Sequence, residues 1–208
     1  MTRIIAGRWG GRRIAVPPRG TRPTTDRVRE AVFSRLDHED RLRGARVLDL
    51  FAGSGALGLE ALSRGAAHAT LVEADARAVA VMRGNVRDLG AGDDARVVKE
   101  RVHAFLSHEG NGWDVILLDP PYDIPRDELA QVLAAAGERL GSGGVLVLEW
   151  STRAGEAPWP STVEAVHAKA YGETTIHYAA RRAPDPGAPL EGQGDELDAG
   201  PDGGSVEP

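Results

Sequence analysis

Apolar runs and helical patterns follow one another along most of the chain. Five short, nearly continuous apolar runs have the length of buried strands. The segments between them carry apolar residues at a helical spacing. We expect strands near 46–51, 69–73, 95–98, 113–119 and 143–150, with helices near 56–64, 75–89, 101–108 and 126–140. This alternation predicts an α/β fold built on a doubly wound sheet.

Two further strands are expected at the end of the patterned region. Residues 163–171 and 174–180 are joined by Gly172 and Glu173, which suit a turn. A glycine-rich run at 141–144 ends the helix that precedes the fifth strand. The pattern therefore supplies seven candidate strands for a single sheet.

The first residues predict a small module of their own. Apolar residues at 4–5 and 14–16 flank a turn that contains two glycines, which is typical of a hairpin. Thr24 or Thr25 could cap a helix that follows it. Trp9 could stack on a base, but packing within the hairpin is the interpretation we favour.

Three regions result from this pattern. We expect a basic hairpin and helix at 1–36, a sheet domain at 37–182 and a tail at 183–208. The tail is rich in Pro, Gly, Asp and Glu, a composition typical of a disordered segment. We expect it to be solubilising; competition with RNA for the basic N-terminal region is the alternative.

Composition excludes several classes of protein. The chain has no cysteine and six histidines, which rules out disulfides and thiolate metal sites, and no metal is indicated. No apolar stretch approaches the roughly 20 residues of a membrane span, and the N-terminus lacks the apolar core of a signal peptide. We therefore expect a cytoplasmic protein. No exposed heptad or self-complementary patch predicts anything beyond a monomer.

Charge is distributed very unevenly along the chain. The net charge is −6, yet residues 1–35 hold nine arginines against two acids, and residues 183–208 hold seven acids and no base. Guanidinium groups match phosphate oxygens and stack on bases, so the N-terminal region predicts RNA binding. A solvated amphipathic hairpin is the alternative, because arginine is the general basic residue of this chain. The candidate RNA-binding residues are Arg3, Arg8, Arg12, Arg13, Arg22, Thr24, Arg27 and Arg29.

A glycine-rich motif follows the first predicted strand of the sheet domain. Gly53, Gly55 and Gly58 have the G-x-G-x-x-G spacing that lets backbone approach a ligand at a helix N-terminus. The motif alone is weak evidence, because dinucleotide-binding proteins share it. Asp49, within the strand, could meet a cationic ligand such as an ammonium group. Glu73 ends the next strand, where it could accept both hydroxyls of a ribose; a solvated charge is the alternative.

A second motif, Asp119-Pro120-Pro121-Tyr122, directly follows the apolar run 115–118. The carboxylate of Asp119 and the carbonyl of Pro120 could each accept one N–H of a planar amine and direct its lone pair at an electrophile. Tyr122 offers a face on which a base can stack. A strand that simply stops at two prolines is the alternative.

Together these motifs resemble a known family. The run from Asp49 to Gly58, the strand-end Glu73 and the tetrapeptide at 119–122 are similar to S-adenosylmethionine-dependent methyltransferases of amino groups. The N-terminal runs 3–8, 11–14 and 22–33 resemble the RsmD-type family in particular. The likeness covers about residues 3–180.

The resemblance implies both a fold and an activity. The fold is a Rossmann-like class I methyltransferase, with a seven-stranded, mostly parallel sheet, an antiparallel edge strand and an N-terminal hairpin and helix. The activity is methylation of the N2 amine of one specific guanine in 16S ribosomal RNA. The cofactor would be S-adenosylmethionine, and the partner would be 16S rRNA or the small ribosomal subunit.

The resemblance also assigns site residues. Asp119, Pro120, Pro121 and Tyr122 would hold the target base. The cofactor would lie against Asp49, Phe51, Ala52, Gly53, Ser54, Gly55, Gly58, Glu73, Ala74, Glu100, Arg101 and Val102. At one of these positions the chain departs from the family, because Arg101 stands where an Asp or Asn usually accepts the adenine amine. Either Glu100 takes that role, or the backbone around Val102 does.

Two other functions stay open at this point. DNA adenine-N6 and cytosine-N4 methyltransferases share the Asp-Pro-Pro-Tyr motif, but this chain has no large insert for recognising a DNA target. A non-catalytic nucleotide- or RNA-binding module would share the sheet but would not need the intact tetrapeptide.

Overall fold

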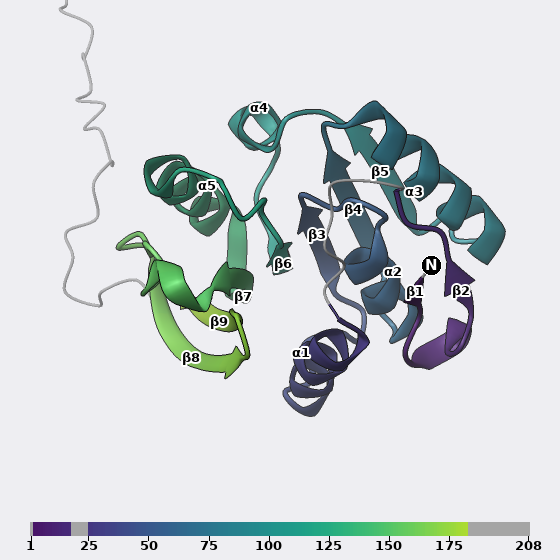
Figure 1. The fold of residues 1–208 in the computed structure, drawn as a ribbon, viewed down its shortest axis with the longest axis horizontal. Helices are drawn as coiled ribbons and strands as arrows, with labels where there is room; N and C mark the ends of the chain where they lie inside the picture. The colour runs from purple at the N-terminus through teal and green to yellow at the C-terminus, as the bar shows by residue number, and fades with distance from the viewer. Residues whose placement is uncertain (1, 18–24, 183–208) are drawn as a thin grey trace, which may run out of the picture.

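A seven-stranded sheet forms the centre of the computed structural model, which describes residues 2–17 and 25–182 (Figure 1). Its strands lie in the order β5-β4-β3-β6-β7-β9-β8. In chain order they are β3 (Arg46–Leu50), β4 (His68–Glu73), β5 (Ala95–Lys99), β6 (Trp113–Leu118), β7 (Leu140–Ser151), β8 (Val163–Tyr171) and β9 (Thr174–Arg181).

Strands β3 to β7 are parallel, and the last two strands form an antiparallel pair at one end of the sheet. β9 lies against β7, and β8 forms the outer edge. The predicted seven-stranded, mostly parallel α/β sheet with its antiparallel edge pair is therefore confirmed.

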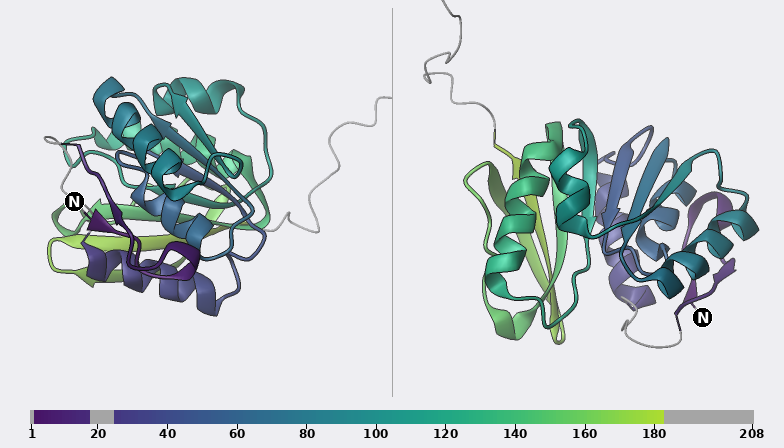
Figure 2. Two further views of the ribbon diagram at one scale, coloured as in Figure 1. Left: turned by 90° about the vertical axis from the view of Figure 1, so that its right-hand side faces the viewer. Right: turned by 90° about the horizontal axis from the view of Figure 1, so that it is seen from above.

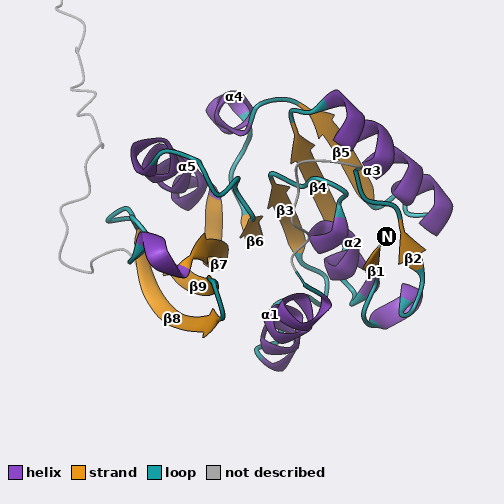
Figure 3. Ribbon diagram, in the orientation of Figure 1, coloured by secondary structure: helices purple, strands orange, loops and turns teal. Residues whose placement is uncertain are grey.

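Helices cover both faces of the sheet, as Figures 2 and 3 show. α1 (Asp26–His38), α2 (Ala56–Ser63) and α3 (Ala76–Leu89) pack on one face, and α4 (Val102–His108) and α5 (Arg126–Arg139) pack on the other. Because both faces are buried, the central strands are apolar along their whole length rather than at alternate positions. The fully buried Phe33 of α1 and Phe105 of α4 each stabilise their face by about 2 kcal/mol.

The N-terminal residues form the expected hairpin, but its strands begin one or two residues earlier than the apolar residues 4–5 and 14–16 predict. β1 (Thr2–Arg3) pairs with β2 (Arg13–Ile14), and a 3-10 turn, η1 (Gly7–Trp9), lies between them. Trp9 is only 8% exposed, so the packing interpretation of this residue is correct. α1 is capped by Thr25, whose hydroxyl accepts the Val28 N–H at 3.3 Å. Thr24, the other candidate cap, lies outside the described residues.

β7 begins three residues earlier than predicted, directly after α5. Leu140 at its start pairs with Trp113 of β6, and a Cβ on Gly144 would lie 2.7 Å from the Trp113 carbonyl oxygen, so this close approach needs a glycine. β7 is followed by a short turn, η2 (Thr152–Ala154).

In the part of the chain that the structure describes, no helix is both long and apolar enough to cross a membrane. The predicted acidic tail at 183–208 lies outside the described residues.

Candidate active site

The order of the strands places two loops side by side. After β3 the chain moves outward to β4 and then β5, whereas β6 lies on the other side of β3 and leads to β7. Leu50 at the end of β3 is in register with Leu118 at the end of β6. The loops that follow these residues therefore meet at the point where the strand order reverses, which is where open α/β sheets bind ligands.

The loop after β3 turns sharply away from the sheet. Phe51 has φ +62°, a conformation that side-chain-bearing residues rarely adopt, and Gly53 and Gly55 have φ +54° and +80°. A non-glycine residue in this region costs on the order of 1 kcal/mol or more, and such strain is concentrated at functional sites. Phe51 keeps the conformation because its ring packs against the buried cluster on the α4 and α5 face.

Two glycine amides, one in this loop and one at the start of α2, hold the two acidic residues of the site in place. The Gly58 N–H donates to Asp49 Oδ2 at 2.8 Å, and the Gly53 N–H donates to Glu73 Oε2 at 3.0 Å. The Asp75 N–H donates to the other oxygen of Glu73 at 2.8 Å. These glycine amides therefore bind carboxylates of the protein itself, which fixes the directions of both acids.

Asp49 is buried and only half satisfied. Its side chain is 1% exposed, and its Oδ1 has no hydrogen-bond partner within the described residues. Burial, with a smaller contribution from the charge of Glu73, raises the pKa of Asp49 to about 7, although the Gly58 amide opposes the shift. A buried carboxylate oxygen without a partner is costly, and an incoming cation would remove that cost.

These residues fit S-adenosylmethionine, which carries an ammonium group and a ribose. The unpaired Oδ1 of Asp49 is the acceptor that an ammonium group needs. Glu73 uses one lone pair of each oxygen on backbone amides, which leaves acceptor capacity for the two ribose hydroxyls. Ala52 and Ser54 lie in the loop after β3, and Ala74 directly follows β4.

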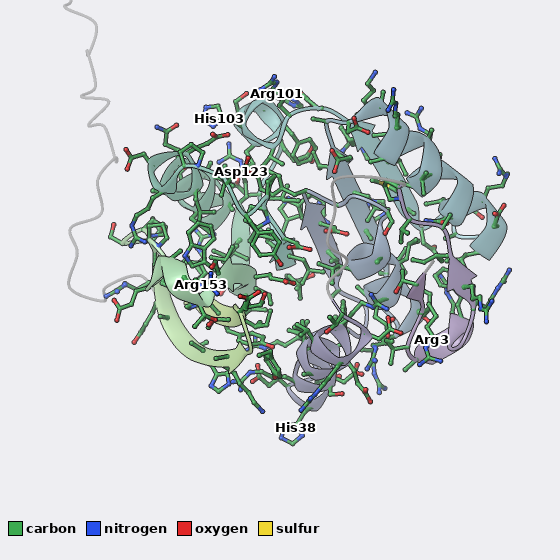
Figure 4. The ribbon with its side chains drawn as sticks, viewed as in Figure 1. Arg3, His38, Arg101, His103, Asp123 and Arg153 are labelled. Atoms are coloured by element: carbon green, nitrogen blue, oxygen red, sulfur yellow. The ribbon has the colours of Figure 1, made fainter. Side chains whose placement is uncertain are left out.

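The end of β5 differs from what the resemblance implies. Glu100 interacts with His108, whose Nε2 lies 3.1 Å from both carboxylate oxygens. Arg101 is exposed at the start of α4, as Figure 4 shows. Val102, the first residue of α4, is 6% exposed. The Glu100 carboxylate keeps acceptor capacity beside His108, so Glu100 and the backbone at Val102 both stay candidate contacts for an adenine.

The Asp119 motif follows β6 at the same edge of the sheet. Asp119 is half-buried and Pro120 is buried, whereas Tyr122 is 51% exposed. The Pro121 carbonyl accepts the Ile124 N–H at 3.0 Å and closes a turn that leads into α5. The motif therefore combines a partly shielded carboxylate with an exposed aromatic ring.

The end of β7 lies next to this motif. Leu148 is in register with Leu118, so Glu149 is at the level of Asp119 on the neighbouring strand. Glu149 is half-buried. Trp150 is 5% exposed and belongs to the buried cluster on the α4 and α5 face of the sheet, so it is a packing residue.

Comparisons with known proteins agree with this geometry. A family model described as "Conserved hypothetical protein 95" matches residues 2–180. The chain belongs to this family. Together with the relatives described next, this match confirms the resemblance to the RsmD type.

Relatives in the family are named as rRNA methyltransferases. The chain is 49% identical over 121 residues to Ribosomal RNA small subunit methyltransferase D of Escherichia coli, a match that covers 58% of this chain and 60% of the relative. It is 36% identical over 151 residues to the protein of the same name from Haemophilus influenzae, covering 71% and 77%. A solved structure of the Escherichia coli protein yhhF superposes with a TM-score of 0.79 at 36% identity, covering 88% of this chain and 99% of that one. These relatives do not favour the DNA methyltransferase alternative.

Within this family fold, the predicted RNA-binding arginines lie in different environments. Arg13 and Arg27 are exposed. Arg3 lies 3.3 Å from Asp26, and Arg8 lies 2.6 Å from Asp94. Arg12 is exposed and donates to the Asp88 carbonyl at 2.6 Å. Arg22 and Thr24 lie outside the described residues.

Arg29 requires a correction. Its side chain is 1% exposed, and it donates to the Arg3 carbonyl at 2.6 Å and to Asp26 at 2.8 Å. Its Nε lies 3.9 Å from the fully buried Glu60. A guanidinium enclosed in this way cannot reach phosphate, so Arg29 joins the N-terminal strand to α1 and is not part of the RNA-binding set.

Two further residues that shape the site were not identified from the sequence. Glu60 of α2 accepts the backbone amides of Ile5 and Ala6 at 2.6 and 3.1 Å. Asn85 of α3 binds both Ala15 and Ser54. Each is a polar residue on the apolar side of its helix, and that position is the signal that could have identified it. No group of side chains among the described residues could hold a metal ion.

Proposed function

We propose that this chain methylates the exocyclic N2 amine of one specific guanine in 16S rRNA of the small ribosomal subunit, using S-adenosylmethionine. The observation that carries the proposal is the adjacency of two strand ends where the strand order reverses: the end of β3 presents the unpaired oxygen of buried Asp49, and the end of β6 leads into the Asp119 motif. The E. coli match covers 60% of that relative's length, so its activity is carried over here as a proposal.

The cofactor half of the site is formed by β3, β4 and their loops. S-adenosylmethionine supplies an electrophilic methyl group on a sulfonium when it is bound. Asp49 would pair with its ammonium group and Glu73 with its ribose hydroxyls. The loop from Phe51 to Gly55 and the start of α2 would set the depth at which the cofactor lies.

The base half of the site deals with a poor nucleophile, because the lone pair of a nucleobase amine is delocalised into the ring. The Asp119 carboxylate and the Pro120 carbonyl would each accept one N–H of the amine. This would localise the lone pair and direct it at the methyl group, so that positioning and electrostatics supply most of the rate increase. The proton would leave to Asp119 or to solvent.

Tyr122 would stack on the target base once that base has left its RNA helix or loop. Its exposed ring offers a stacking surface worth roughly 1–3 kcal/mol, which offsets part of the cost of extruding a stacked base. Tyr122 is 51% exposed, so its ring is accessible to a base.

Guanine differs from adenine because it presents a second donor, N1–H, beside its exocyclic amine. Glu149 would supply the matching acceptor, because the register of β6 and β7 places it at the level of Asp119. A site with two carboxylates then favours guanine over adenine, whose ring nitrogen at that position is an acceptor.

A transfer assay tests this function. The protein is incubated with labelled S-adenosylmethionine and, in parallel, small subunits lacking the methyl group, the corresponding naked 16S rRNA and unmethylated duplex DNA. We expect label in the subunit or rRNA reaction, recovered as N2-methylguanosine. Label in methyladenine or methylcytosine from DNA would overturn the proposal.

A further inference from the structure

Asn85 connects the N-terminal hairpin to the glycine loop. This residue of α3 is 3% exposed and uses its whole amide group. Its Oδ1 accepts the Ala15 N–H at 2.8 Å, and its Nδ2 donates to the Ala15 carbonyl at 2.9 Å. The same Nδ2 donates to the Ser54 carbonyl at 2.9 Å. One side chain therefore binds the segment after β2 and the loop after β3.

Apart from the bond between Arg8 and Asp94, the other hydrogen bonds that anchor the hairpin go to residues of helices. Glu60 holds Ile5 and Ala6 on α2, and Ser63 accepts the Trp9 N–H at 3.0 Å. Figure 1 shows the hairpin lying beside α2 and α3. The bonds through Asn85 thus link the hairpin directly to residues that would surround a cofactor.

The link through Asn85 is broken if either the glycine loop or the N-terminal hairpin moves. Ser54 lies between Gly53 and Gly55, both in the left-handed region, so its carbonyl points to Asn85 only while the loop keeps this conformation. If the loop shifts, a buried amide donor loses a partner, which is unfavourable. If the hairpin shifts, the two bonds to Ala15 are broken instead.

We propose that Asn85 is a positioning residue that couples RNA binding by the N-terminal hairpin to cofactor binding by the glycine loop. The inference rests on the proposed function, because it takes RNA as the ligand of the hairpin and S-adenosylmethionine as the ligand of the loop. Each ligand stabilises the conformation that Asn85 holds, so each raises the affinity of the other by the same factor.

The first test measures binding of S-adenosylhomocysteine by calorimetry, with and without a 16S rRNA fragment. We expect RNA to tighten binding by about fivefold or more in the wild type, a ratio typical of such coupling. Asn85→Ala and Asn85→Asp should bring the ratio close to one. Arg83→Ala, an exposed change on the same helix, should leave the ratio unchanged. An unchanged ratio in both Asn85 variants would overturn the inference.

The second test needs no variant, so it does not depend on whether an Asn85 substitution folds. Hydrogen exchange of the Ala15 amide, which donates to Asn85, is followed in the wild type as S-adenosylhomocysteine is added without RNA. We expect exchange at Ala15 to slow severalfold. Unchanged exchange on a protein that binds the cofactor contradicts the coupling alone, whereas failure of the wild type to bind it contradicts the proposed function.

Discussion

Gly58 lies so close to Asp49 that its amide donates to Asp49 Oδ2 at 2.8 Å and a Cβ at this position would be 3.2 Å from the same oxygen. The same Cβ would lie 2.1 Å from Leu71 Cδ2 on β4. A glycine at this point therefore lets α2 pack on the sheet and hold Asp49 without displacing Leu71.

The first prediction follows from that contact. We expect Gly58→Ala to destabilise the protein by about 1–3 kcal/mol, because the added methyl group overpacks the interface between α2 and β4. Gly84→Ala is the matched control, since it places the same methyl in a helix where the nearest atom, Arg87 Nη2, is 3.8 Å away. It should stabilise the protein by roughly 0.5–1 kcal/mol. Urea unfolding measures both, and equal shifts in the two variants would contradict the packing argument.

The second prediction concerns pH. In the cofactor-free protein the pKa of Asp49 is raised to about 7 by burial, whereas an unfolded chain has an ordinary aspartate near 3.9. The folded state binds the proton more tightly, so its stability falls as pH rises from about 4 to about 7 and then levels off.

Asp49→Asn removes that loss, because asparagine is neutral throughout. At pH 8 we expect this variant to unfold at a higher temperature than the wild type, because its free energy of unfolding is larger by on the order of 2 kcal/mol. The difference should shrink towards pH 5. The variant should also lose most of its affinity for S-adenosylhomocysteine. Calorimetric melting at several pH values tests the first point; a difference that grows on acidification would refute the assignment.

The third prediction separates base binding from cofactor binding. We expect Tyr122→Ala to lower kcat/KM for RNA by about 10- to 100-fold, which corresponds to the loss of one stacked base, while S-adenosylhomocysteine affinity is unchanged. Tyr122→Phe keeps the ring and should retain most of the activity. A similar loss in both variants would indicate a role for the hydroxyl rather than for stacking.

The fourth prediction separates two kinds of arginine. We expect Arg13→Gln with Arg27→Gln to weaken rRNA binding at all sequences and to lower the salt slope by about one for each phosphate that is no longer neutralised. Stability should hardly change, because both side chains are exposed.

Arg29→Gln is the counterpart. We expect it to destabilise the protein by about 1–3 kcal/mol, since it removes the bonds to the Arg3 carbonyl and Asp26, while the buried Glu60 keeps Arg64 at 2.7 Å. Thermal unfolding and filter binding distinguish the two effects. RNA affinity that falls in the folded Arg29 variant, with no fall in stability, would contradict the assignment.

The sequence predicted the sheet well because each central strand is buried on both faces, and a continuous apolar run is a strong signal. It also placed Asp49 and Glu73 at the ends of neighbouring strands. It could not predict Arg29, because a basic segment gives no indication of which guanidinium turns inward. Figure 4 shows how far the basic side chains spread, with Arg3 and Arg153 at opposite sides of the molecule.

Contacts between distant segments were also beyond the sequence pattern. The bond from Asn85 to Ala15 joins residues 70 positions apart, and the bond from Glu60 to Ile5 joins residues 55 apart. Periodicity describes one element at a time, so it marks a polar residue on an apolar face but cannot name its partner. The early start of β7 has a similar origin, since Leu140 pairs with Trp113 of β6, a distant contact that the pattern along the chain does not show.

The measurement that tests the account most directly identifies the nucleoside that this protein methylates on small subunits lacking the modification. Wild type and Asp119→Asn are compared by mass spectrometry of the digested rRNA. The account predicts N2-methylguanosine with the wild type and a strong reduction with the variant, which still binds S-adenosylhomocysteine. Methyl transfer to another atom, or equal yields from both proteins, would contradict the central role given to the Asp119 motif.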